Sequence, residues 1–327
     1  MTPTVEAAAP RQEAGRLATL DDLYSEADRL DLTPGWVPRS KPILWPEPHS
    51  VFAPAHWSYA EAKASLQAAG RLIDVTLAER RNLVMRNPAP DTNFETTRTI
   101  VCAYQMILPG EIAPSHRHSS HALRVIIDGK GSYSIVNGQK MPMETGDVVL
   151  TPGGYWHGHG HDGDQPAYWF DGLDVPLTHL LEPVFFDEHP QKYEKVERVV
   201  MSSPFRFTRD DIASRLDKAS PDHEGFHGRR ITLAAPEMPS MSLAMERLPA
   251  GNNTRRYRST ANTVFHVVAG QGESRIGDRK FDWQPGDTFA APSWTKIEHR
   301  PGSDATLFVL SDEPLLRFAN YYRFEAD

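Results

Sequence analysis

Short apolar stretches alternate with turn residues in two long parts of the chain, from about residue 97 and again from about residue 241. Strands are expected at TIVCAYQMIL, ALRVIID, GSYSIV, DVVLT and AYWFDGL, because each is a run of strand-forming residues between Gly, Asp and Asn turns. Asn137-Gly138 separates GSYSIV from QKMPM and predicts a two-residue hairpin. The pattern therefore predicts a mainly β protein.

Helical patterns occur in only a few places. Thr19, followed by two aspartates, begins a first helix, and Ser58 begins a second, in which a glutamate three residues later completes a capping box. Thr208 caps a third helix in TRDDIASRLDKA. Frequent prolines between the first two helices predict an extended arm, and residues 1–16 are small and polar, which predicts disorder.

The two strand-rich parts resemble each other. VIIDGKGSYSIVNGQ corresponds to VVAGQGESRIGDR, and ETGDVVLTPGGYW corresponds to QPGDTFAAPSWTK, in the same order along the chain. Two such matches indicate a duplicated unit and predict two small barrels in tandem. We place the barrels at residues 96–185 and 241–327, a helical and extended arm at 17–95, and a linker with one helix at 186–240.

Composition and charge narrow the classes of partner. The formal net charge is -8 and there is no run of Lys and Arg, which argues against nucleic acid and anionic membranes as partners. No apolar run approaches the length of a membrane span. Cys102 is the only cysteine, so an intrachain disulfide is impossible, and we expect a cytoplasmic protein.

Histidines are concentrated in the first barrel. Six of the fourteen lie between residues 116 and 161, in HRHSSH and HGHGH. Because side chains alternate along a strand, His116 and His118 share one face, and His157, His159 and His161 share a face of a second strand. An antiparallel barrel brings such strands together, so the pattern predicts a metal site, against the alternative of surface or core histidines that cluster by chance.

The spacing of these histidines resembles the motifs of the cupin family. GEIAPSHRH resembles the first cupin motif and GDVVLTPGGYWH the second. Common cupins add a glutamate four or five residues after HxH, where this chain has Ala122 and Leu123. The resemblance therefore implies an all-β bicupin of two tandem double-stranded β-helix (jelly-roll) barrels with a short helical N-terminal region. It also implies a metal bound by three histidines without a carboxylate.

A wider resemblance, from about residue 50 to the C-terminus, is to the gentisate 1,2-dioxygenase family, which includes salicylate and 1-hydroxy-2-naphthoate dioxygenases. It is carried by AERRNLVMRNP, LPGEIAPSHRHSSHALRVIIDGKG, LTPGGYWHGHG and WFDGLDVPL. It implies Fe(II) bound by His116, His118 and His157, and cleavage of the C1–C2 bond of a 2-hydroxybenzoate with dioxygen. Gentisate is the first expected substrate, and salicylate, 5-substituted salicylates such as 5-nitrosalicylate, and 1-hydroxy-2-naphthoate are alternatives. A homo-oligomer, dimeric or tetrameric, is also implied.

Two arginine positions are candidates for binding the substrate carboxylate. Arg124 lies in the apolar strand ALRVIID, and a buried guanidinium requires an acidic partner. That partner is either Glu144 or Asp147, or a substrate carboxylate held by two hydrogen bonds, and the family resemblance favours the substrate. The same resemblance places the first arginine of the Arg80-Arg81 pair in the active site.

The remaining candidate residues are expected to surround the aromatic ring of the substrate. Val101 and Ala103 are expected to line the pocket, with Gln105 beside them or else satisfied by the backbone as a core amide. His159 is expected to hydrogen-bond the substrate phenol, although it is also a rival metal ligand to His157. By resemblance, Asp171 orients His159 or a ligand imidazole, with Asp174 as the alternative. No role is assigned to His121 and His161, which are expected to be exposed or structural.

The second barrel lacks this histidine pattern. It has RRYRS (255–259) where HRH is expected, Ile297 at the place of His157, and His299 alone at the place of His159. We expect it to be structural. A non-catalytic metabolite-binding bicupin is a competing interpretation, but it predicts degenerate histidines in both barrels. Other metal-dependent cupin enzymes are a third, and they usually keep the missing glutamate.

Overall fold

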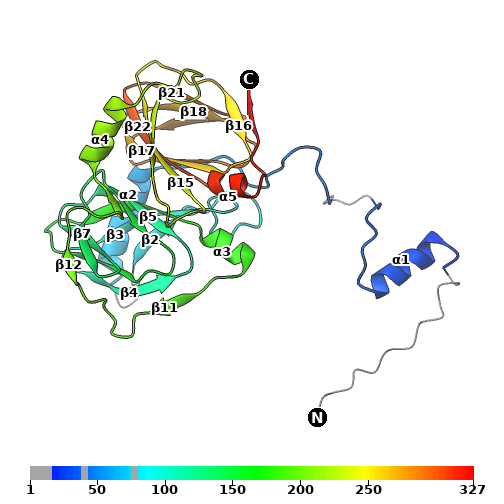
Figure 1. Cartoon of the computed structure of the whole chain (residues 1–327), viewed down its shortest axis with the longest axis horizontal. Coiled ribbons are helices and arrows are strands. Elements are labelled where there is room, and N and C mark those ends of the chain that lie inside the picture. Colours follow the sequence, from blue (N-terminus) through cyan, green and yellow to red (C-terminus); the bar gives the residue numbers. More distant parts are fainter. Residues whose placement is uncertain (1–16, 38–42, 75–79) are drawn as a thin grey trace, which may run out of the picture. The chain divides into compact units, whose positions relative to one another are not determined.

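The computed structural model describes residues 17–37, 43–74 and 80–327, so the disorder expected for residues 1–16 lies outside the described part. The chain divides into two compact units, Met1–Glu47 and Pro48–Asp327 (Figure 1). In the first unit, helix α1 (Leu20–Arg29) begins at Thr19, whose side chain forms the full capping box with Asp22. Among the described residues, no helix is long and apolar enough to cross a membrane.

The second unit contains two β-barrels. The first barrel is built from β3 (Val101–Ile107), β4 (Ile112–His118), β5 (Ala122–Asp128), β6 (Ser132–Val136), β7 (Gln139–Pro142), β8 (Val148–Thr151), β9 (His157–His161) and β10 (Ala167–Leu173). The second is built from β15 (Ser242–Leu248), β16 (Tyr257–Ser259), β17 (Thr263–Ala269), β18 (Gly272–Ile276), β19 (Arg279–Trp283), β20 (Thr288–Ala291), β21 (Ile297–Pro301) and β22 (Ala305–Ser311).

Strand order confirms the duplication expected from the sequence. The order β8-β5-β10-β3 in one sheet of the first barrel matches β20-β17-β22-β15 in the second. The facing sheets match in the same way, with β4-β9-β6-β7 against β16-β21-β18-β19. The expected hairpin is present between β6 and β7, where Asn137 and Gly138 have φ values of 48° and 78°. Both barrels are therefore copies of one antiparallel unit.

Segments outside the repeated strands extend the edges of both barrels. β1 (Ala55–Trp57) pairs with β20, and β2 (Arg81–Val84) pairs with β3. The region 186–240 contains α4 (Arg209–Lys218), capped by Thr208 as expected. It also contains four strands at the edges, namely β11 (Phe186–Glu188), β12 (Arg198–Val199), β13 (Arg206–Phe207) and β14 (Arg229–Leu233).

The remaining helices adjoin the barrels. They are α2 (Tyr59–Leu72), α3 (Val175–Leu181) and α5 (Glu313–Phe318), and β23 (Phe324–Ala326) follows α5. The Ser58 hydroxyl accepts a hydrogen bond from the Glu61 backbone N–H at 3.4 Å. The reciprocal contact from the Glu61 side chain, which the expected capping box requires, is not among the contacts of the described helix. Ser58 is thus an ordinary N-cap.

The side chains of β3 alternate between the core shared by the two barrels and the interior of the first barrel. Cys102, Tyr104 and Met106 belong to a hydrophobic core that also includes Phe308 and Leu310 of the second barrel. The Tyr104 hydroxyl reaches across and donates to the Gly286 carbonyl at 2.7 Å. Val101, Ala103 and Gln105 therefore project from the opposite face, into the first barrel.

Candidate metal centre and active site

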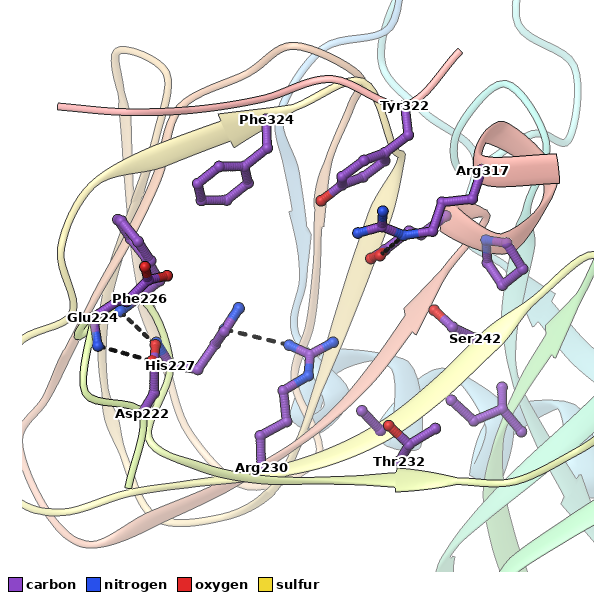
Figure 2. Close-up of a pocket in the computed structure, with 14 residues that line it drawn as sticks. Asp222, Glu224, Phe226, His227, Arg230, Thr232, Ser242, Arg317, Tyr322 and Phe324 are labelled. Atoms are coloured by element: carbon purple, nitrogen blue, oxygen red, sulfur yellow. Dashed lines mark hydrogen bonds and ion pairs between the residues drawn. The ribbon is translucent and has the colours of Figure 1, made fainter. Parts of the chain in front are cut away.

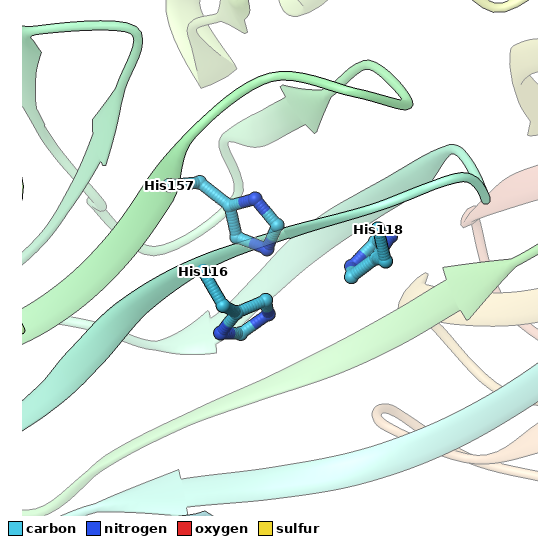
Figure 3. A group of neighbouring side chains, drawn as sticks. All are labelled: His116, His118 and His157. Carbon is cyan, nitrogen blue, oxygen red and sulfur yellow. The ribbon is translucent and has the colours of Figure 1, made fainter. Parts of the chain in front are cut away.

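Three histidines converge inside the first barrel (Figure 3). β4 pairs with β9 so that His116 lies directly opposite His157. His118 lies two residues further along β4, on the same face. One ring nitrogen from each of the three lies within 4.8 Å of the others. The triad expected from the sequence is thus assembled by strand register alone.

The alternating glycines of HGHGH explain how β9 presents its histidines. His157, His159 and His161 share one face, and Gly158 and Gly160 occupy the other. A Cβ atom at Gly160 would collide with the Tyr133 ring of the neighbouring strand. Glycine there lets β6 and β9 pair closely, which holds the histidine face toward the barrel interior.

Backbone carbonyls orient two of the three imidazoles. Nδ1 of His157 lies 3.0 Å from the Tyr155 carbonyl, and Nδ1 of His118 lies 2.8 Å from the Ser120 carbonyl. Such contacts fix the Nδ1–H tautomer and direct the lone pair of Nε2 away from the backbone. Nε2 of His157 is buried and has no hydrogen-bond partner in the structure. A buried acceptor of this kind fits a metal ligand.

Burial and nearby arginines keep these imidazoles neutral. Desolvation, reinforced by the Arg80 guanidinium, lowers the pKa of His116 to about 2. Desolvation lowers the pKa of His118 to about 4, and that of His157 lies well below its ordinary value. Neutral imidazole is the form that binds a divalent metal, so the donor set fits a three-histidine site.

Arg124 faces the triad from the opposite sheet. Asp171 of β10 lies between Ala103 of β3 and Arg124 of β5 in the strand register. Nε of Arg124 lies 3.4 Å from the Asp171 carboxylate, and Nη1 donates to the Thr151 hydroxyl at 2.7 Å. The structure thus gives Arg124 a protein partner that the sequence analysis did not consider.

The alternative prediction, a salt bridge from Arg124 to Glu144 or Asp147, is wrong. Asp147 instead pairs with Arg206 at 2.5 Å and accepts the Arg209 backbone N–H at 2.9 Å. The reason is the strand register. Asp147 precedes β8 at the end of the barrel, where β13 reaches it, whereas Arg124 projects into the interior.

The Asp171 carboxylate contacts Arg124 and Trp169, and its hydrogen bonds do not involve a histidine. Nε1 of Trp169 donates to its two oxygens at 3.1 and 3.2 Å. Desolvation raises the pKa of Asp171 to about 6, against the lowering effect of Arg124. Asp174, the alternative, lies at the N-terminus of α3 and accepts the His121 backbone N–H at 2.7 Å.

His159 lies in the interior of the first barrel, near His157 and Trp169. Its ring lies 6.1 Å from that of His157 and 5.9 Å from that of Trp169, between centroids. Both ring nitrogens are buried without a hydrogen-bond partner in the structure. Val101, Ala103 and Gln105 are buried on the inward face of β3, with Gln105 opposite Trp169 in the register.

The two adjacent arginines have different roles. Arg80 lies against His116, with guanidinium nitrogens 2.9 and 2.6 Å from the two ring nitrogens. Arg81 instead makes a two-pronged salt bridge to Glu111, at 2.7 and 2.8 Å, and donates to the Ile73 carbonyl. Arg81 is therefore paired away from the triad, whereas Arg80 contacts one of the triad imidazoles.

His121 and His161 are both bound to the backbone. Nδ1 of His121 accepts the Gly153 N–H at 2.9 Å, and the ring of the buried His161 contacts the Gln165 carbonyl and the Gly163 N–H. Sequence reasoning missed Phe186 of β11, whose ring lies 4.9 Å from that of His116. Phe186 lies some seventy residues after the motif, and only the pairing of β11 with β4 brings it there.

The second barrel has lost each ligand position. Tyr257 pairs with Ile297 as His116 pairs with His157, so tyrosine and isoleucine occupy two ligand positions and Ser259 the third. His299 remains, with Nδ1 2.7 Å from the Ser274 hydroxyl. Within the described ranges, no second group of histidine, cysteine and carboxylate side chains converges as the triad does.

The two barrels and the buried triad define a bicupin. A family model for the cupin domain matches residues 103–175. The chain is 35% identical to gentisate 1,2 dioxygenase 1 of Aquipseudomonas alcaligenes, over 92% of this chain and 95% of that protein. It is 32% identical to 5-aminosalicylate 1,2-dioxygenase of Comamonas sp, over 94% of this chain and 90% of that protein.

A solved structure gives the same result. A variant of salicylate 1,2-dioxygenase from Pseudoaminobacter salicylatoxidans, in complex with gentisate, superimposes with a TM-score of 0.86 at 25% identity. The superposition covers 99% of this chain and 98% of that one. The chain belongs to the gentisate 1,2-dioxygenase family of ring-cleaving dioxygenases.

Proposed function

We propose that this enzyme is an Fe(II)-dependent dioxygenase that cleaves the C1–C2 bond of a 2-hydroxybenzoate, with gentisate as the first candidate substrate. The observation that carries the proposal is the buried guanidinium of Arg124 in the same barrel interior as three converging neutral imidazoles, whose pKa values it helps to lower. One side of that pocket suits a metal, and the other suits the carboxylate of an aromatic acid.

His116, His118 and His157 are the proposed ligands. When bound, ferrous iron supplies adjacent coordination positions for a chelating substrate and dioxygen, and the one-electron chemistry that joins them. The three histidines add no negative charge, and no glutamate follows the first motif.

The arginines position the substrate carboxylate. A guanidinium has five N–H donors, and Arg124 uses one on Thr151 and lies 3.4 Å from Asp171 through another. The remaining donors suit a carboxylate held by two parallel hydrogen bonds. The ion pair with Asp171 holds the Arg124 side chain in position. Arg80, which contacts His116, adds a second positive charge.

The substrate hydroxyl is assigned to His159. A neutral imidazole has one donor and one acceptor, and neither nitrogen of His159 has a hydrogen-bond partner among the residues that the structure describes. An ortho hydroxyl beside the metal would supply one, and a hydrogen bond with the neutral ring would orient that hydroxyl. Gln105 and Trp169 form the adjacent wall, and Val101 and Ala103 leave space beside the aromatic ring.

Substrate choice is the finer part of the proposal. The relatives include enzymes named for gentisate and for 5-aminosalicylate, which share a carboxylate and an ortho hydroxyl. Salicylate, 5-substituted salicylates such as 5-nitrosalicylate, and 1-hydroxy-2-naphthoate keep the same pair of groups and are the alternatives. The small side chains of Val101 and Ala103 favour tolerance of a ring substituent.

We further propose a cytoplasmic homo-oligomer. A single cysteine, Cys102, which is buried, suits a reducing compartment. Exposed apolar side chains along 180–201, among them Leu181, Val199 and Met201, suit a contact between copies of the chain. Sedimentation of the purified enzyme tests the oligomeric state.

The test is oxygen uptake by iron-loaded protein with gentisate, salicylate, 5-substituted salicylates and 1-hydroxy-2-naphthoate. The variant His157→Ala should lose both bound iron, measured by elemental analysis, and oxygen uptake. His223→Ala, which replaces an exposed histidine of the linker, is the matched control and should keep both. Full activity of His157→Ala, or no uptake with any of these acids, contradicts the proposal.

A further inference from the structure

A cavity of about 560 Å³ opens in the second barrel, away from the histidine triad. Figure 2 shows Arg230, Arg317 and Tyr322 directed toward the same open space, with Phe324 at one side. Ser242 and Ala244 of β15 also line it. The mechanism proposed for the first barrel makes no use of this cavity.

Strand register identifies the cavity as the counterpart of the first-barrel pocket. Ser242 pairs with Ser311 at the ends of β15 and β22, as Val101 pairs with Leu173 at the ends of β3 and β10. Ser242 and Ala244 therefore occupy the positions of Val101 and Ala103.

The segment after each barrel repeats as well. Phe324 of β23 pairs with Ser259, as Phe186 of β11 pairs with His118. Phe324 stacks on Tyr257 with ring centroids 5.5 Å apart, whereas Phe186 lies against His116, the counterpart of Tyr257. Three lining residues of the cavity thus correspond to residues at the proposed catalytic pocket.

In the second barrel, apolar side chains stand at two positions that are charged in the first barrel. Phe265 occupies the position of Arg124 and stacks on Phe289, with ring centroids 5.1 Å apart. Val309 occupies the position of Asp171. The second barrel has therefore lost the counterparts of Arg124 and Asp171, although it keeps the buried Glu246 at the position of Gln105.

The charged groups of the cavity come from other elements, and its lining holds the carboxylates of Asp222, Glu224 and Glu313 beside two arginines. Arg230 of β14 pairs through Nη1 with the fully buried Glu246 at 3.2 Å, and Arg317 of α5 pairs through Nε with Glu313 at 2.6 Å. Each guanidinium has five donors, so both retain donors beyond these contacts. Asp222, another carboxylate of the lining, already accepts the backbone N–H groups of 224, 226 and 227.

The walls between these charges are aromatic. Phe226 and Phe324 meet edge to face at 5.2 Å, and the Arg317 guanidinium lies 3.9 Å above the Tyr322 ring. We propose that this cavity is a second, non-catalytic binding site for a small aromatic carboxylate, with the carboxylate between Arg230 and Arg317 and the ring against Phe226 and Phe324. The duplicated pocket then binds the same class of molecule in both barrels and transforms it in only one.

The test uses salicylate as the probe, in equilibrium dialysis of the iron-loaded enzyme without oxygen. The full chain should bind two molecules of salicylate per chain. The double variant Arg230→Gln, Arg317→Gln should lose one equivalent, with affinity at that site reduced at least about tenfold, because charge-assisted hydrogen bonds are removed. Arg300→Gln, an exposed arginine of the same barrel, is the matched control.

A second variant protects against loss of folding. Ser242→Phe leaves both arginines in place and fills the floor of the cavity, and it should abolish the same equivalent while turnover continues. Arg124→Gln should remove only the salicylate bound in the first barrel. Failure of the catalytic proposal and failure of the second-site proposal therefore give different results. Unchanged salicylate binding in both the double variant and Ser242→Phe overturns the second site.

Discussion

The Thr99 hydroxyl donates a 2.6 Å hydrogen bond to the buried carboxylate of Asp312, 213 residues away along the chain. Ser240 makes the equivalent bond to Asp174 at 2.5 Å. In each case the hydroxyl precedes the first core strand of one barrel, and the carboxylate follows the last core strand of the other. The two barrels are thus joined by a reciprocal pair of hydrogen bonds, which reflects their internal two-fold relation.

Removing one of these hydroxyls should destabilise the whole two-barrel unit. In Thr99→Val, Asp312 keeps its bonds from Asn262, at 2.8 and 2.7 Å, but loses the one that spans the barrels. We expect the free energy of unfolding to fall by about 1–2 kcal/mol. Ser240→Ala should have a similar effect, and urea denaturation followed by fluorescence measures both. No change in either midpoint would contradict a stabilising role.

Substitution of His159 should separate metal binding from turnover. His159→Asn removes the imidazole proposed to act on the substrate hydroxyl and leaves His116, His118 and His157 intact. We expect wild-type iron content and a kcat lower by about 10²–10⁴-fold. Loss of iron together with activity would instead assign His159 to the metal, which was the rival interpretation from the sequence.

Arg124 should act on substrate binding and leave the metal in place. In Arg124→Gln we expect a KM for gentisate about 10–100-fold higher, because a charge-assisted bidentate contact is lost. Iron content should be unchanged. Arg117→Gln is the matched control, since Arg117 lies between two proposed ligands but pairs with Asp187 at 2.9 Å on the outer side. Equal KM values for the two variants would remove Arg124 from the substrate site.

His266 should make the fold sensitive to acid. It is buried between the barrels, stacks on Phe170 at 4.8 Å and contacts the Thr288 hydroxyl at 3.1 Å. Desolvation lowers its pKa to about 3, despite the opposing effect of Asp287. Because the folded pKa is depressed below the unfolded value, stability is greatest above about pH 6.5 and falls as pH decreases toward 3.

The variant His266→Gln isolates this effect. At pH 7 it should be less stable than the parent, since stacking on Phe170 is lost. Between pH 6.5 and pH 4, however, its free energy of unfolding should fall less steeply, by up to about 1.4 kcal/mol per pH unit. Thermal denaturation at a series of pH values checks this. Parallel curves for the two proteins would show that His266 does not titrate on unfolding.

Local patterns in the sequence predicted much of the first barrel. The strands, the Asn137-Gly138 hairpin and the facing histidines depend on alternation and turn chemistry within a few residues, which a single sequence displays. The triad could be predicted because its members are in adjacent strands whose motifs mark the register. The duplication was visible for the same reason, through the repeated Gly-Asp turns.

Partners distant in sequence could not be predicted. Arg124 meets Asp171 because β5 and β10 pair in one particular register, and nothing near Arg124 in the sequence indicates it. The edge strands β1, β11 and β23 are three residues each, too short for a periodic pattern. Phe186 and Phe324 are positioned by the pairing of β11 and β23, so the contact of Phe186 with His116 and the place of Phe324 in the second-barrel cavity were not predicted.

The pairing of Ala55 with Ala290 has a consequence for biosynthesis. Strand β1 leaves the ribosome long before β20 has been made, so it must wait without a partner while the intervening polypeptide is translated. A fragment ending before β20 therefore carries an unpaired edge, and release of such nascent chains should favour aggregation. The C-terminal half must therefore be completed before the edge of the N-terminal strand β1 is paired.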